Sequence, residues 1–85
     1  MASREHDFTV WCEGGGDDLQ VAMRTMARWF GGKVKSEGHE LRYPTRRYMT
    51  ASFDNYLYGE MWRDASKLAV KNLHGTVIEV NDAAR

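Results

Sequence analysis

Residues 7–32 read DFTVWCEGGGDDLQVAMRTMARWFGG, and this stretch decides the fold. Its first seven residues place Phe8, Val10 and Cys12 on one side and Thr9 and Trp11 on the other. Such alternation is typical of a strand with one buried face. After three glycines, apolar residues recur every three or four positions, which predicts an amphipathic helix. The predicted stripe consists of Leu19, Ala22, Met23, Met26, Ala27 and Phe30.

The ends of this helix also have sequence signals. Asp17 is predicted as the N-cap, with Gln20 answering it in a capping box. Gly31 and Gly32 are expected to end the helix, because glycine accepts a left-handed backbone. Asp17 and Asp18 stand where a phosphate-binding loop would need a lysine, so residues 14–16 are interpreted as a turn and not as an anion site.

The middle of the chain reads as strands. Residues 33–35 pair with residues 39–43 in a hairpin, or the whole region forms one longer, irregular strand; the pattern leaves both open. A turn is expected at residues 44–45. Residues 46–53 then alternate again, which predicts a third strand with one buried face.

A second helix is expected to begin between residues 54 and 60. Asp54 is predicted to cap it, with Phe53 and Tyr58 forming a hydrophobic staple. Gly75 closes the helix, and residues 76–80 form the last strand. The predicted apolar stripe of this helix consists of Met61, Trp62, Ala65, Leu68, Ala69 and Leu73.

The resulting order, β-α-β-β-α-β, predicts an α+β ferredoxin-like sandwich with two helices on one face of a four-stranded antiparallel sheet. Residues 1–85 would form one domain, with residues 1–6 and 82–85 as flexible ends. In this arrangement the first and third strands lie side by side. Trp11 and Tyr48 should therefore be neighbours on the face that the helices leave open.

Composition narrows the functional classes. The chain has 85 residues, 42% of them hydrophobic and 28% charged, with a formal net charge of zero. A duplex-DNA binder usually carries a positive excess, which is absent here. The charges are nevertheless uneven, because residues 1–20 sum to −4 and residues 33–47 sum to +3.

The compartment follows from the same survey. Cys12 is the only cysteine, so an internal disulfide is excluded and the cytoplasm is the expected location. No apolar run approaches the roughly 18 residues of a membrane span. We therefore expect no membrane association.

No motif predicts catalysis, a metal or a cofactor. Cys12 points inward, and an arginine that would hold a phosphate beside it is replaced by Asp18. His6, His39 and His74 are too widely spaced for a metal site. We expect a protein that is not an enzyme.

An aromatic and basic surface is the remaining functional signal. Trp and Tyr together with Arg are the residues that binding hot spots favour. The predicted partner-binding residues are Trp11, Tyr48, Tyr43, Arg42, Arg46 and Arg47. They predict a protein-binding module that covers a partner's surface as an inhibitor, adaptor or accessory subunit. Phages deploy proteins of this size against host complexes in that way, which is an analogy of fold and size.

Two alternatives use the same face. One is single-stranded nucleic-acid binding, since aromatic rings also stack on unpaired bases. The element order is that of RNA-recognition domains, but Thr50 stands where their third strand carries a stacking ring, and the net charge is neutral. The other alternative is a homodimer formed through this face.

Overall fold

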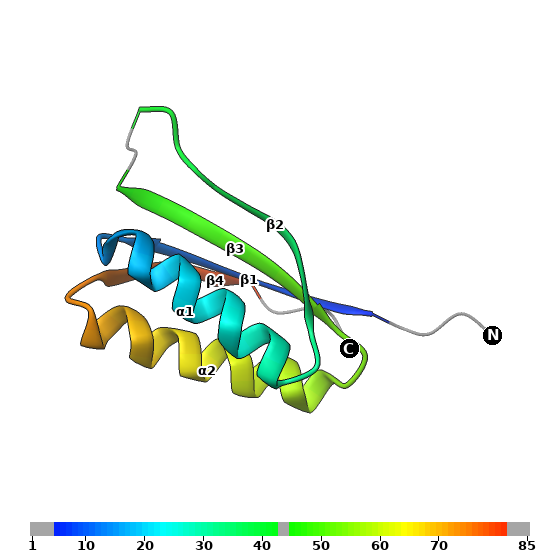
Figure 1. The fold of residues 1–85 in the computed structure, drawn as a ribbon. Coiled ribbons are helices and arrows are strands. Elements are labelled where there is room, and N and C mark those ends of the chain that lie inside the picture. The colour runs from blue at the N-terminus through cyan, green and yellow to red at the C-terminus, as the bar shows by residue number, and fades with distance from the viewer. Residues whose placement is uncertain (1–4, 43–44, 82–85) are drawn as a thin grey trace.

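The computed structural model describes residues 5–42 and 45–81. Two helices lie side by side on one face of a single sheet, and the opposite face carries no helix (Figure 1). The elements are β1 (His6–Glu13), α1 (Gly16–Trp29), β2 (Lys33–His39), β3 (Arg46–Phe53), α2 (Tyr56–Asn72) and β4 (Thr76–Asn81). Among these described residues, no helix has both the length and the apolar character that crossing a bilayer requires.

The sheet has the order β2-β3-β1-β4, and every pair of neighbours is antiparallel. This confirms the predicted ferredoxin-like arrangement, with β1 and β3 in the centre. β2 pairs along β3 from Lys33 to His39, with one shift in register between Val34 and Ser36. The hairpin alternative is therefore wrong, and the single irregular strand is confirmed as far as His39, where β2 ends.

The core lies between the helices and the inner face of the sheet, as the alternation predicts. β1 and β3 contribute Phe8, Val10, Cys12, Met49, Ala51 and Phe53, all of them buried. α1 adds three buried residues from its predicted stripe, Leu19, Met23 and Ala27. Trp62 of α2 is fully buried, and its Nε1–H donates a hydrogen bond of 2.9 Å to the carbonyl oxygen of Met23. That bond ties the two helices together.

Both predicted N-caps are wrong. The N-cap of α1 is Gly15, whose φ of 81° is left-handed. Asp17 lies inside the first turn, where its negative charge interacts favourably with the positive end of the helix dipole. α2 is capped by Asn55, whose side-chain oxygen accepts a 2.9 Å hydrogen bond from the backbone N–H of Leu57. At the other end of α1, Gly31 adopts the predicted left-handed backbone, with a φ of 75°.

The N-terminal boundary also differs from the prediction. His6 is part of β1, pairing with Phe53, so the ordered chain begins before residue 7. The other residues expected to be flexible, 1–4 and 82–85, lie outside the described residues, and Glu5 is described ahead of β1.

The predicted apolar stripe of α2 is confirmed at Trp62 and Ala69, which lie in or against the core, and is wrong at its largest aliphatic residues. Met61 and Leu68 are 44% and 62% exposed. The helix instead turns toward the sheet a face built from Gly59, Trp62, Ser66 and Val70. Small residues occupy this face because the helix approaches β1 closely: a Cβ at Gly59 would overlap the ring of Phe8.

Candidate functional site

The centre of the open sheet face holds two stacked rings. Trp11 on β1 is directly opposite Tyr48 on β3, and their ring centroids are 4.8 Å apart at an interplanar angle of 32°. Tyr48 extends over Gly38 of β2, where an added Cβ would lie 3.0 Å from the Tyr48 ring. Two residues along the same strands, the side-chain hydroxyls of Thr9 and Thr50 form the next cross-strand pair on this face, with their oxygens 2.7 Å apart. The two rings therefore extend over β1, β3 and β2, and the Thr9–Thr50 hydroxyl pair lies next to them.

Charged side chains lie along the same face, in oppositely charged pairs. Arg46 Nε is 3.4 Å from a carboxylate oxygen of Glu13. Lys35 Nζ is 3.2 Å from Asp7 and 3.9 Å from Glu5. All five side chains are between about one third and one half exposed, so these pairs contribute little stability. Glu13 and Arg46 are adjacent to the rings along the two central strands, and Asp7 and Lys35 lie beyond the Thr9–Thr50 pair on the other side, so both signs of charge are present at each end of the row.

Arg47 does not belong to this face, which corrects the prediction. It pairs in register with Cys12, whose side chain is in the core, and its guanidinium reaches α1. There Nη1 donates hydrogen bonds of 2.6 Å to Asp17 and 3.1 Å to Gln20. Alternation explains the error, because adjacent residues on β3 point to opposite faces and Tyr48 is on the open one.

Cys12 is set up as a core residue. Burial raises the pKa of its thiol, and the nearby positive charge of Arg47 opposes that shift only in part. A raised pKa keeps the thiol protonated, whereas a nucleophilic cysteine needs its thiolate. The thiol therefore packs and is not poised to react.

The remaining predicted residues lie in or next to the connection between β2 and β3. Arg42 is exposed and follows the end of β2. Tyr43 lies outside the described residues. Of the six predicted binding residues, Trp11, Tyr48 and Arg46 share the open face, and Arg47 is on the helix-covered side.

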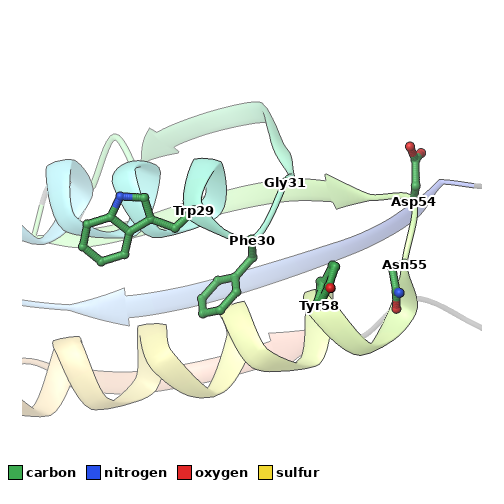
Figure 2. A pocket seen from close by; sticks show the side chains of 6 residues that line it. All are labelled: Trp29, Phe30, Gly31, Asp54, Asn55 and Tyr58. Carbon is green, nitrogen blue, oxygen red and sulfur yellow. The ribbon is translucent and has the colours of Figure 1, made fainter.

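A cleft of about 470 Å³ lies at the opposite surface, between the end of α1 and the start of α2. Its lining residues are Trp29, Phe30, Gly31, Asp54, Asn55 and Tyr58 (Figure 2). Trp29 is 75% exposed and Tyr58 is 47% exposed. Figure 2 shows Trp29 and Asp54 at opposite ends of the cleft, with Asp54 directed away from Phe30 and Tyr58. These groups do not converge on one point, so the cleft offers a shallow apolar wall.

Sequence reasoning missed this cleft. A signal was present for one residue, because Trp29 falls off the apolar stripe of α1 at helical spacing. The others are brought together by the packing of α1 against α2, which no local pattern predicts.

The residues that could ligate a metal are spread over the fold in residues 5–42 and 45–81. Within these ranges no three His, Cys, Asp or Glu side chains are grouped so that they could hold a metal ion. His6 packs edge-on against Tyr56, with centroids 5.4 Å apart, in the manner of a structural ring.

No protein-family model matches the chain, and no curated protein matches it. Two solved structures share its fold. The crystal structure of AtUAH in complex with glyoxylate superposes with a TM-score of 0.66 and 9% identity, over 94% of this chain and 27% of that one. The complex of AtUAH with (S)-hydroxyglycine gives 0.63 and 10%, over 93% and 27%. At such identity the likeness shows the fold alone, and this chain corresponds to about a quarter of the length of AtUAH.

Proposed function

We propose that this chain is a non-enzymatic protein-binding module that covers a partner's surface with the open face of its sheet. It would act as an inhibitor, adaptor or accessory subunit. The observation that carries the proposal is the stacked pair of Trp11 and Tyr48 at the centre of the face that no helix covers. Aromatic anchors at the centre of a patch, inside a polar rim, are the usual anatomy of a protein interface.

The charges around the rings favour a protein partner over a nucleic acid. A surface that tracks a phosphate backbone needs unpaired cations. Here Arg46 and Lys35 are each next to a carboxylate, so the face offers positive and negative groups together. Such a mixed rim suits a partner of matching mixed charge, and it orients that partner more than it tightens binding.

The test uses two tryptophans on opposite surfaces. We would immobilise the wild type, Trp11→Ala and Trp29→Ala, and capture proteins from an extract of the organism that encodes the chain. Wild type and Trp29→Ala should retain the same protein. Trp11→Ala should lose it, because removing a central anchor typically weakens binding by at least ~2 kcal/mol, or about thirtyfold.

Controls separate the alternatives. Circular dichroism should show that all three proteins are folded, since the stacked pair itself contributes only ~0.5–1.5 kcal/mol. Loss of the partner with Trp29→Ala but not with Trp11→Ala would contradict the proposal and would indicate that the partner binds at the cleft beside Trp29. Retention of nuclease-sensitive material that washes off with moderate salt would support single-stranded nucleic-acid binding instead.

A further inference from the structure

The cleft between the two helix ends has a wall of three aromatic rings. Trp29 and Phe30 come from the end of α1, and Tyr58 comes from the first turn of α2. Phe30 packs partly against the core, whereas Trp29 and Tyr58 are 75% and 47% exposed. Rings exposed to this extent contribute little to the core, so they form apolar surface that a ligand could cover.

The middle of the cleft is open because Gly31 carries no side chain. Its φ of 75° is the left-handed backbone that ends α1. A Cβ built at this position would have no heavy atom of the rest of the chain within 4 Å, apart from its two neighbours. The cleft volume of about 470 Å³ is within the ~300–1,000 Å³ that is typical of small-molecule sites. The cleft therefore has room for a small organic molecule.

One charged group lines the cleft, the carboxylate of Asp54. It is exposed, and within residues 5–42 and 45–81 no cation pairs with it. None of the lining residues in these ranges is a lysine, arginine or histidine. The backbone N–H of Leu57 donates to the side chain of Asn55, so an anion could not use that amide. The ring faces are electron-rich as well, so the lining favours a cationic ligand.

The order of these groups along the cleft favours an elongated ligand. Figure 2 shows Phe30 and Tyr58 between Trp29 at one end and Asp54 at the other, with Asp54 directed away from the rings. A ligand that contacts both features needs an apolar body on the rings and a charged group on an arm that reaches the far end. The separation between rings and carboxylate therefore selects for shape as well as for charge.

We infer that this cleft binds an arylalkylammonium ion, in which a short flexible chain joins an aromatic ring to a protonated amine. The aromatic ring of the ligand packs on Phe30 and Tyr58 beside Trp29, in the offset or edge-to-face arrangements that aromatic pairs prefer. The ammonium group pairs with Asp54 at the far end. Burial of the ring supplies the affinity, and the ion pair selects the sign of the charge.

The first experiment titrates phenethylammonium into the isotope-labelled protein and follows the indole N–H signals of the three tryptophans by NMR. The Trp29 signal should shift in a saturable way, with a dissociation constant of about 1 mM. This value is at the low end of the affinity per atom that fragments reach, because the cleft is shallow. The Trp11 and Trp62 signals should stay in place, since Trp11 is on the open sheet face and Trp62 is buried.

The second experiment separates the charge from the ring with two probes of similar shape. Neutral phenethyl alcohol should bind about threefold more weakly than phenethylammonium, and anionic hydrocinnamate about tenfold more weakly, because an exposed ion pair is worth little. Asp54→Asn should weaken phenethylammonium about threefold and leave phenethyl alcohol unchanged. Asp64→Asn, which removes an exposed carboxylate of α2 outside the cleft, is the matched control and should keep the order of the three probes.

The third experiment removes one wall of the cleft. Trp29→Ala should weaken phenethylammonium about tenfold, followed through the backbone amide signals of Gly31 and Tyr58, because a ring contact and its buried area are lost. Trp11→Ala is the control on the other layer and should bind the probe as the wild type does. Thermal melts should show all four variants folded, since none of the substituted side chains belongs to the buried core.

The inference is overturned if no cleft signal shifts at concentrations well above the expected dissociation constant. Equal binding of hydrocinnamate and phenethylammonium would also overturn it, as would an Asp54→Asn variant that keeps the preference for the cation. A shift of the Trp11 signal without one at Trp29 would show that the probe binds the open sheet face instead. The proposed function does not depend on any of these outcomes, because its test follows retention of a protein partner through Trp11.

Discussion

At Gly59, helix propensity and core packing predict opposite changes in stability for the substitution Gly59→Ala. In the interior of a helix, alanine is favoured over glycine by about 1 kcal/mol. On that basis alone Gly59→Ala would stabilise the protein. The structure predicts the reverse, because the new methyl group would lie 2.7 Å from Cζ of Phe8 and closer still to Cε1.

The magnitude depends on whether the Phe8 ring can move aside. It is fully buried and packs against two other rings, with centroids 6.0 Å from Phe53 and 5.2 Å from Tyr56. Overpacking of such a core costs ~1–3 kcal/mol, and an overlap with a ring held on two sides belongs at the upper end. After subtracting the gain of about 1 kcal/mol in helix propensity, Gly59→Ala should lose about 2 kcal/mol.

Urea unfolding measures this directly. A chain of this length is expected to have a stability of ~4–13 kcal/mol, so the loss is readily resolved. The melting temperature should fall by about 8–16 °C. Thr25→Ala, at an exposed position of α1, is the propensity control and should be neutral or slightly stabilising.

A double-mutant cycle identifies the cause. Phe8→Leu removes ring atoms from the site of overlap, so Gly59→Ala should cost less in the Phe8→Leu background than in the wild type. If Gly59→Ala proves as stable as the wild type or more so, the close approach of α2 to β1 is refuted. Strict additivity of the two changes would place the strain on some other neighbour.

Three further predictions follow from single contacts. Asn55→Ala should cost about 1 kcal/mol in urea unfolding by removing the cap of α2, and Asp54→Ala should cost clearly less. Trp62→Phe should cost ~1–3 kcal/mol, because the 2.9 Å bond to the Met23 carbonyl is lost and the ring is smaller; an unchanged midpoint would deny that bond a role. Cys12 in the native protein should react with iodoacetamide much more slowly than in urea, because burial raises the pKa of its thiol. The folded state favours the protonated thiol, so this contribution to stability is present at neutral pH and disappears as pH rises through the folded-state pKa. Equal labelling rates in the native and the urea-unfolded protein would contradict this.

The strands were predictable because their signal is local. Phe8, Val10 and Cys12 point inward by simple alternation, and the same parity brings Trp11 and Tyr48 together once β1 and β3 are neighbours. Arg47 was assigned to the wrong face although parity already excluded it, since it alternates with Tyr48. The error came from grouping residues by chemical type over their position in the strand.

The orientation of α2 was not predictable from its large apolar residues. Its inner face includes Gly59 and Ser66, which fit where the backbone must come close to the sheet. Leucine and methionine elsewhere on the helix gave a stronger hydrophobic signal and drew the predicted stripe outward. The cleft beside Trp29 was missed for a related reason, because it exists only where two helix ends meet.

The three tryptophans give the molecule a built-in set of optical reporters. Trp62 is buried in the interior, Trp11 shares the uncovered sheet surface with a tyrosine, and Trp29 is 75% exposed. Replacing any two by phenylalanine would leave one tryptophan, whose emission wavelength and quenching describe a single layer when it is excited selectively over the tyrosines. Loosening of the interior, an encounter at the sheet and a change at the helix ends could then be followed independently in one small chain.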